Sequence, residues 1–323
     1  MSEHLEQSIF QITNKHYFNA LALAIFKHQF EQNKTYQEYC KLLKKNPENV
    51  NSILEIPFLP IQFFKSHSII CGDKKPEIVF SSSGTTGIET SKHLVRDLSI
   101  YKQSFLTAFD HFYPNWKNSA IIGLLPSYLE RKVSSLIYMV NELILKSSHT
   151  KSGFHLTLDQ EMLDFMQNDD SPKILIGVTF ALLDLADQKI SLKNTTVIET
   201  GGMKGKRKEI IREELHEILK TGLNQNTIHS EYGMTELLSQ AYYQGKNFIC
   251  PSWMKVLIRE TTDPLSTFLT GKGALNVIDL ANIHSCSFIA TDDLGEVFSD
   301  GEFSVLGRLD HSQIRGCNLM TYG

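Results

Sequence analysis

The chain has 323 residues, of which 41% are hydrophobic and 21% charged, so it can bury the core of a soluble protein with one or two domains. Its formal net charge of −4 offers no basic surface, which argues against nucleic acid as a partner. Five scattered cysteines without a CxxC pair argue against a zinc site and a disulfide framework, and the lack of a signal peptide or membrane-length apolar run predicts a cytoplasmic protein without a membrane span.

Residues 1–70 carry apolar side chains at helical spacing between charged positions, which predicts an N-terminal helical segment. Residues 71–250 then alternate between apolar strands and helices. Strands are expected at residues 77–80, 119–125, 173–178, 195–200 and 227–230, and helices at 97–112, from about 134, at 179–185 and at 206–220. Continuous apolar strands separated by helices predict an α/β core with a largely parallel sheet, flanked by helices on both faces.

The pattern changes after Pro251, where short strands replace the alternation. They are expected at residues 254–260, 273–279, 288–290, 296–298 and 302–306. We therefore expect a β-rich subdomain at residues 251–307, followed by a hinge and a C-terminal tail at residues 308–323.

A run of small residues, Ser81-Ser-Ser-Gly-Thr-Thr-Gly87, follows the first strand of the core. Without bulky side chains its backbone N–H groups are open to a polyanion, and its hydroxyl groups suit phosphate oxygens and a magnesium ion. It is not a Walker loop, because no Gly-Lys-Ser/Thr follows the second glycine. A flexible Ser/Gly turn is the alternative interpretation.

Two more loops follow predicted strands, one at Gly201-Gly202 and one at Tyr232–Glu236. In an open parallel sheet, ligands bind beyond the carboxyl ends of the strands, so the three loops can converge on one cleft. Each residue also has a plainer interpretation. Tyr232 can be a packed aromatic, and Glu236 a first-turn carboxylate favoured by a helix dipole.

The order and rough spacing of four motifs resemble those of the adenylate-forming superfamily of acyl-CoA synthetases, peptide-synthetase adenylation domains and luciferases. The motifs are Ser81–Gly87, His229–Glu236, Thr291–Gly295 and Gly307–Asp310. The plainer interpretations of these motifs also include Asp292 and Asp293 as turn formers and Arg308 as a surface residue. The resemblance implies instead that the chain binds ATP and Mg²⁺ through these motifs. His229 stays outside the expected catalytic set, as a strand-end histidine.

The resemblance also implies roles for individual residues. Tyr232 is expected to stack on adenine, Glu236 to act in catalysis and hold magnesium, and Asp293 and Arg308 to bind the ribose hydroxyls. Thr85 is expected to act in catalysis. The other expected ATP-binding residues are Ser82, Ser83, Gly84, Thr86, Gly87, Gly201, Gly202, Gly233 and Thr235.

Four further segments look like the LuxE-type acyl-protein synthetases: Ile56–His67, Leu125–Arg131, Thr200–Gly205 and Ile314–Leu319. Those enzymes activate a fatty acid with ATP and load it onto a cysteine near their own C-terminus. The resemblance implies that Cys317 is the acyl acceptor and that an acyl-accepting protein, such as an acyl reductase or a carrier protein, is the partner. Arg315 and Gly316 would favour a mobile thiolate, whereas the plainer interpretation is an incidental buried thiol.

The chain also departs from the superfamily pattern. It ends soon after Gly307–Asp310, so the small C-terminal lid domain is expected to be absent, which weakens the interpretation as a CoA ligase. Lys92 stands after an insertion where most members place Pro-Lys, and its role stays open. Two alternatives therefore remain: a ligase that acylates CoA or a carrier protein, and a non-catalytic protein that binds a nucleotide or an acyl group.

Overall fold

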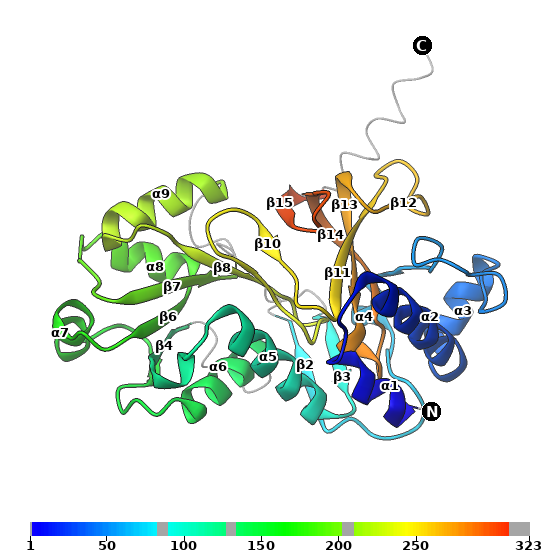
Figure 1. The fold of residues 1–323 in the computed structure, drawn as a ribbon, viewed down its shortest axis with the longest axis horizontal. Helices are drawn as coiled ribbons and strands as arrows, with labels where there is room; N and C mark the ends of the chain where they lie inside the picture. Colours follow the sequence, from blue (N-terminus) through cyan, green and yellow to red (C-terminus); the bar gives the residue numbers. More distant parts are fainter. Residues whose placement is uncertain (1, 83–89, 127–133, 202–209, 310–323) are drawn as a thin grey trace, which may run out of the picture. The chain divides into compact units, whose positions relative to one another are not determined.

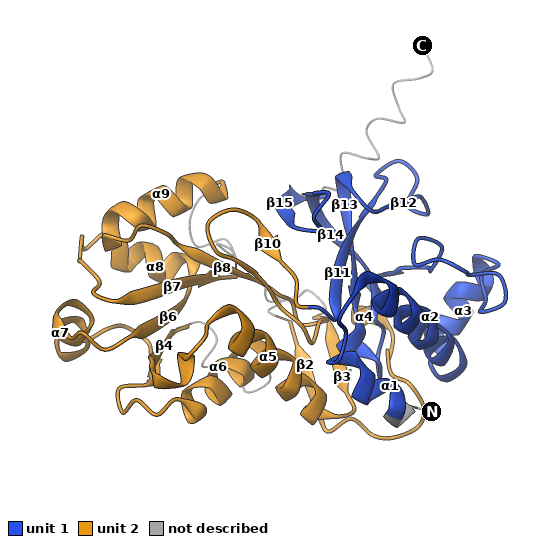
Figure 2. Ribbon diagram, viewed as in Figure 1, with its two compact units in different colours: residues 1–63, 252–323 blue, residues 64–251 orange. Residues whose placement is uncertain are grey.

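The computed structural model describes residues 2–82, 90–126, 134–201 and 210–309 (Figure 1). The chain forms two compact units, one from residues 1–63 and 252–323 and the other from residues 64–251 (Figure 2). The N-terminal helices and the C-terminal β-rich segment therefore belong to the same unit, which we call unit 1. The unit formed by residues 64–251 is unit 2.

Unit 2 is built on a mostly parallel sheet, as the sequence predicts (Figure 1). Its strand order is β10-β9-β8-β7-β6-β4-β5, and β8, β7, β6, β4 and β5 run parallel. The strands are β4 (Ala120–Leu124), β5 (Gly153–His155), β6 (Lys173–Val178), β7 (Thr195–Thr200), β8 (His229–Tyr232), β9 (Ala241–Tyr243) and β10 (Phe248–Ile249). Every residue of β4 and β6 is buried, which explains why both strands are apolar apart from Lys173 at the start of β6.

Helices cover both faces of this sheet, with α8 and α9 on one face and α5 and α6 on the other (Figure 1). The helices are α4 (Phe63–Ser66), α5 (Leu98–Phe112), α6 (Ser135–Lys146), α7 (Gln160–Asn168), α8 (Thr179–Ala186) and α9 (Arg212–Leu223). A short 3-10 helix lies at Trp116–Asn118. Asp97 caps α5 as expected, because its side chain accepts a hydrogen bond from the Ser99 amide. The expected start of α9 at residue 206 falls outside the described residues.

The strand at the start of the core does not join the parallel sheet. β2 (Ile78–Ser81) pairs antiparallel with β3 (Lys92–Val95) in a separate two-stranded sheet. The register places Ser81 opposite Lys92, so this hairpin holds the two ends of the Ser/Gly loop together.

Unit 1 contains an antiparallel sheet with the order β12-β11-β13-β14-β15, and β1 pairs with β14. The strands are β1 (Leu59–Pro60), β11 (Met254–Arg259), β12 (Thr267–Phe268), β13 (Gly271–Asp279), β14 (Phe288–Val297) and β15 (Phe303–Arg308). The two short strands expected at 288–290 and 296–298 are one continuous strand, β14. Asp292 and Asp293 are therefore strand residues, and their interpretation as turn formers is wrong.

The helices of unit 1 are α1 (Ser2–Ile9), α2 (Lys15–Gln32), α3 (Lys34–Leu42) and the 3-10 helix at Leu280–Asn282. Gln29, which is fully buried, ties α2 to the segment before β14. Its amide donates to the carbonyls of Asn282 and Ile283 at 2.9 and 3.1 Å, and its oxygen accepts from the Ser287 amide at 3.0 Å. Among the described helices, none combines the length and apolar character needed to cross a bilayer.

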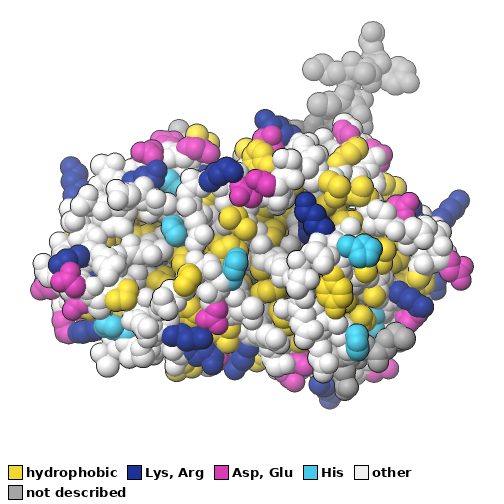
Figure 3. Space-filling view, viewed as in Figure 1, with side chains coloured by type: hydrophobic (Ala, Val, Ile, Leu, Met, Phe, Trp, Pro, Cys, Tyr) yellow, Lys and Arg dark blue, Asp and Glu magenta, His cyan; other side chains and the backbone are white. Residues whose placement is uncertain are grey.

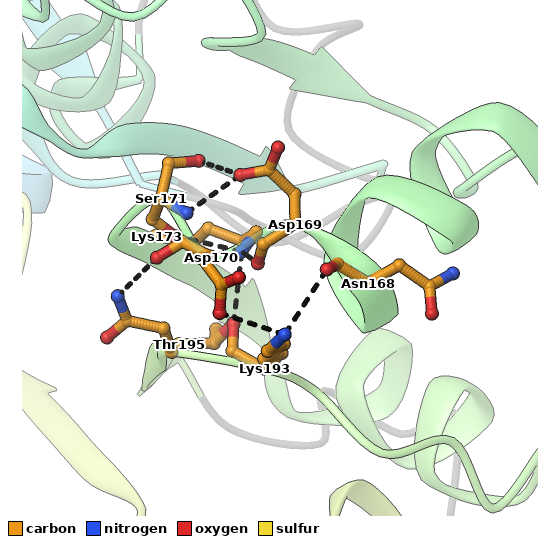
Figure 4. Close-up of polar contacts among 8 residues, drawn as sticks. Asn168, Asp169, Asp170, Ser171, Lys173, Lys193 and Thr195 are labelled. Atoms are coloured by element: carbon orange, nitrogen blue, oxygen red, sulfur yellow. Dashed lines mark hydrogen bonds and ion pairs between the residues drawn. The ribbon is translucent and has the colours of Figure 1, made fainter.

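Charged side chains of both signs lie interspersed on the face of the molecule that Figure 3 shows. Inside unit 2 the charge that stands out is Lys173, at the amino end of β6, which is only 1% exposed. Its ammonium group donates to the carbonyl oxygens of Asp169 at 2.6 Å, Ser171 at 2.9 Å and Lys193 at 3.1 Å (Figure 4). These contacts satisfy a buried cation and join the segments that precede β6 and β7.

We predict that Lys173→Met lowers the free energy of unfolding by about 3 kcal/mol, because three carbonyl oxygens lose a buried charged donor. Lys193→Met is the matched control, since Lys193 pairs with Asp170 at 2.8 Å but its side chain is 47% exposed. That control should cost at most about 1 kcal/mol. Urea denaturation of the two variants measures the difference, and equal losses would contradict the assigned role of Lys173.

Candidate functional site

The candidate site is built on the carboxyl ends of three neighbouring parallel strands. The register aligns Val178 of β6 with Thr200 of β7, and Thr200 with Glu231 of β8. The chain therefore leaves all three strands at the same level. As expected from the sequence, the structure brings Gly201 and the segment from Tyr232 to Glu236 to one edge of the sheet.

Gly201 follows β7 with a φ of +65°, a left-handed backbone conformation that favours glycine. The Thr179 hydroxyl, at the start of α8, lies 2.6 Å from the Gly201 carbonyl oxygen and also contacts the carboxyl group of Glu199. Thr179, directly after the neighbouring strand β6, therefore fixes the backbone conformation of the turn after β7.

Tyr232 ends β8, so it is a strand residue and not a loop residue. It is 8% exposed and its ring lies 5.8 Å from that of Phe248, as in the interpretation of a packed aromatic. Gly233 follows in a crowded position, because a Cβ atom there would lie 2.1 Å from Oε1 of Glu231. A larger residue at 233 would therefore displace the Glu231 side chain.

Glu236 is 5% exposed and lies in a turn, since no helix of the described chain begins at this position. Its interpretation as a first-turn carboxylate stabilised by a helix dipole is therefore wrong. The preceding residue, Thr235, is fixed through its carbonyl oxygen, which lies 2.9 Å from Nδ1 of His93.

His93 is the residue that joins two of the candidate loops. It lies on β3, directly beyond the Ser/Gly loop, and is fully buried with its ring against that of Phe64. Burial lowers its pKa to about 4, so the ring is neutral and its Nδ1–H donates to the Thr235 carbonyl. His93 follows Lys92, which is itself exposed, and the sequence alone predicts no role for His93. A contact to a backbone oxygen leaves no sequence signal.

Ser82 closes the base of the Ser/Gly loop: its hydroxyl oxygen accepts from the Ser91 amide at 2.9 Å, and its own amide donates to the Ser91 carbonyl at 3.0 Å. The other expected residues of this loop, Gly202 after β7 and the cysteine of the tail lie outside the described residues. They are Ser83, Gly84, Thr85, Thr86, Gly87, Gly202 and Cys317.

Asp293 and Arg308 are paired in unit 1, at matching positions of β14 and β15. Nε of Arg308 lies 3.4 Å from Oδ1 of Asp293, and the arginine side chain is 83% exposed while the aspartate is 11% exposed. The neighbouring Asp292 accepts from the Gln62 amide at 2.7 Å. The structure thus presents a carboxylate and a guanidinium group side by side.

His229 behaves as the strand-end histidine that the sequence suggests. Its Nδ1 lies 3.3 Å from the Tyr113 hydroxyl, and burial lowers its pKa. Two acids were missed: Glu199 on β7, which is buried, and Glu231 on β8, which is partly exposed. For Glu199 the signal in the sequence is a carboxylate directly after the apolar pair Val197-Ile198, whereas Glu231 lies in the polar strand His229–Tyr232 and leaves no such signal.

The described residues suit a magnesium ion that arrives with a nucleotide. They contain no cluster of three His, Cys, Asp or Glu side chains that could hold a metal without other ligands. A single buried carboxylate such as Glu236, together with phosphate oxygens and water, is the coordination that Mg²⁺ commonly has at nucleotide sites.

We predict that the neutral state of His93 makes stability depend on pH. Between about pH 6.5 and pH 4 the unfolded chain binds a proton that folded His93 does not, so the native state loses up to about 3 kcal/mol as the pH falls. His93→Asn keeps an N–H donor but cannot titrate. It should be less stable than the parent near neutral pH, and the difference should shrink as the pH falls.

Urea unfolding at a series of pH values measures this difference. Exposed His111 on α5 provides the control: His111→Asn makes the same substitution at a surface position and should cost little stability near neutral pH. A difference between parent and His93→Asn that stays constant over this pH range would show that His93 is not held neutral.

Comparison with known families gives one match over nearly the whole chain. The sequence model described as acyl-protein synthetase, LuxE, matches residues 3–322. No curated protein sequence matches the chain significantly.

Solved structures share the fold at low sequence identity. ATP-bound MatB from Rhodopseudomonas palustris is 15% identical, with a TM-score of 0.52 over 71% of this chain and 47% of that one. The inhibitor-bound N-terminal domain of FACL13 from Mycobacterium tuberculosis is 13% identical, with a TM-score of 0.50 over 75% of this chain and 63% of that one. The chain spans about half the length of MatB. These likenesses show a mixed α/β fold of the adenylate-forming type.

Proposed function

This chain belongs to the LuxE family of acyl-protein synthetases, and we propose on that premise that it is a ligase that activates a carboxylic acid with ATP. The acid is a fatty acid, and the products of the first step are an acyl-adenylate and pyrophosphate. The observation that carries the proposal is the meeting of Gly201 and the segment from Tyr232 to Glu236 at one edge of the parallel sheet. ATP bound to MatB, a protein of the same fold, supports it.

The first step demands positioning more than covalent chemistry from the protein. An oxygen of the substrate carboxylate attacks the α-phosphorus of ATP, and the bond from that phosphorus to the bridging oxygen breaks as pyrophosphate leaves. Catalysis then depends on in-line alignment and on neutralising the phosphate charge with fixed donors. Magnesium held at Glu236 would supply positive charge.

We propose the remaining roles from the resemblance of the motifs to those of the adenylate-forming superfamily. Residues 83–87 supply hydroxyl and amide donors for the phosphates, with Thr85 acting in the reaction. Tyr232 and Gly233 form the adenine-binding surface together with Gly201, Gly202 and Thr235. Asp293 and Arg308 bind the ribose hydroxyls, a role supported by the carboxylate and guanidinium lying 3.4 Å apart on neighbouring strands.

The second step transfers the acyl group to a thiol. The thiolate of Cys317 attacks the acyl carbonyl carbon, AMP leaves with the former carboxylate oxygen, and a thioester forms. A partner protein, such as an acyl reductase or a carrier protein, then accepts the acyl group. The reaction needs reduced thiols, as in the cytoplasm, and no disulfide bond joins the described cysteines, which are Cys40, Cys71, Cys250 and Cys286.

We predict that the protein exchanges labelled pyrophosphate into ATP only when a fatty acid is present. Glu236→Ala should slow this exchange by about a hundredfold, the scale of losing one electrostatic contact in a preorganised site. Glu217→Ala is the control, because Glu217 is an exposed residue of α9 that pairs with Lys220. Exchange without any acid, or a near-parent rate for Glu236→Ala at saturating magnesium, would contradict the proposal.

For the second step we predict that Cys317→Ser keeps acid-dependent pyrophosphate exchange but no longer accumulates a hydroxylamine-labile acyl-enzyme. A serine hydroxyl is a far weaker nucleophile than a thiolate when no general base lies beside it. Cys250→Ser, at a partly exposed position, should still load the acyl group. If the Cys317→Ser variant were labelled at the parent rate, Cys317 would not be the acyl acceptor, and direct transfer of the acyl group to CoA would be favoured.

A further inference from the structure

Glu231 is an acid in an unusual position within the candidate site. It is the residue directly before Tyr232 at the carboxyl end of β8, in register with Thr200 on one side and Tyr242 on the other. It keeps some exposure to solvent, whereas Glu199 on the neighbouring strand is 9% exposed. The two carboxyl groups face opposite sides of the sheet, because Glu199 is in register with Ser230 and not with Glu231.

The contacts of Glu231 suit a neutral carboxyl group better than a carboxylate. The Thr200 hydroxyl donates to Oε2, while Oε1 packs against the backbone of Gly233. The Tyr242 hydroxyl, which is a possible second donor, makes no hydrogen bond to any described residue although Tyr242 is 1% exposed. An ionised carboxylate offers about four acceptor sites, whereas among the described residues Thr200 is the one donor to Glu231.

Among the residues that the structure describes, the groups around Glu231 provide no positive charge. They are Thr200 on β7, Tyr242 on β9, Tyr101 and Tyr113 at α5, and His229 on the same strand as Glu231. Burial lowers the pKa of His229. Glu199 acts on Glu231 from the opposite face of the sheet. Burial, with a smaller effect of the Glu199 charge, raises the pKa of Glu231 to about 7. Burial also raises the pKa of each of the three tyrosines, so they are neutral.

We propose that Glu231 couples ATP binding to proton uptake: the site accepts the nucleotide polyanion only when this carboxyl group is neutral. The inference rests on the proposed function, which places ATP against Tyr232 and Gly233, the two residues that follow Glu231. An ionised Glu231 would repel the phosphates across a partly buried edge where solvent screens charge weakly. Glu231 is therefore a positioning and gating residue for the nucleotide, and the acid itself does not react.

The direction of the pH dependence follows from linkage. Near pH 6 the carboxyl group is already neutral, so ATP binding takes up almost no proton. Near pH 8 it is mostly ionised, so binding takes up close to one proton and the affinity falls by up to about tenfold per pH unit. Glu231→Gln mimics the neutral carboxyl group, so this component disappears in the variant.

Two neighbouring substitutions shift the midpoint in opposite directions. Thr200→Val removes the hydrogen bond that lowers the pKa of Glu231, so the affinity should start to fall at a higher pH than in the parent. Glu199→Gln removes the negative charge that raises this pKa, so the fall should start at a lower pH while the slope persists. A purely structural role of Glu231 would not produce this pair of shifts.

The test is calorimetric titration of the whole chain with MgATP, from about pH 6 to pH 8, in pairs of buffers that differ in ionisation enthalpy. Proton uptake that grows toward one in the parent and is missing in Glu231→Gln supports the inference. Equal uptake in the two proteins, or none in the parent while MgATP binds, overturns it.

If MgATP does not bind to the parent at any pH, the proposed function itself fails. If Glu231→Gln does not fold, the opposite midpoint shifts of Thr200→Val and Glu199→Gln decide the question.

Discussion

The in-register parallel pairing of β6, β7 and β8 is the constraint on which the rest of unit 2 depends. Because Val178, Thr200 and Glu231 stand in one row, the chain must leave the sheet at three adjacent points. Backbone that leaves a strand end has amide and carbonyl groups without ladder partners, and such groups bind side chains or ligands. Lys173 secures the opposite end of β6, so both ends of this strand are fixed.

At this edge of the sheet, side-chain contacts control the charge of the groups that lie near the proposed reaction. Thr179 and Thr200 each donate a hydrogen bond to an acid near the end of β7 or β8, and His93 fixes the backbone beside Glu236 as a neutral donor. None of these three contacts adds a positive charge. In our account the positive charge that offsets the phosphates arrives with the magnesium ion, whose binding therefore belongs to substrate binding.

Apolar patterning predicts the parallel core, the Asp97 cap of α5 and the convergence of two of the loops, because these depend on local sequence and on strand order. It does not predict that β2 leaves the main sheet, or that β14 runs through Asp292 and Asp293, because strand pairing is decided by distant partners. The roles of His93 and Glu231 were also missed. Each depends on contacts with residues far along the chain, such as Thr235 for His93.

The most direct test of the central claim uses a carboxylic acid labelled with oxygen-18 in its carboxyl group. If the carboxylate attacks the α-phosphorus of ATP, one labelled oxygen remains on that phosphorus when the acyl group moves to a thiol, and mass spectrometry finds it in AMP. Label in inorganic phosphate, with ADP as the other product, would show attack on the γ-phosphorus and would contradict assignment of the chain as an adenylate-forming ligase.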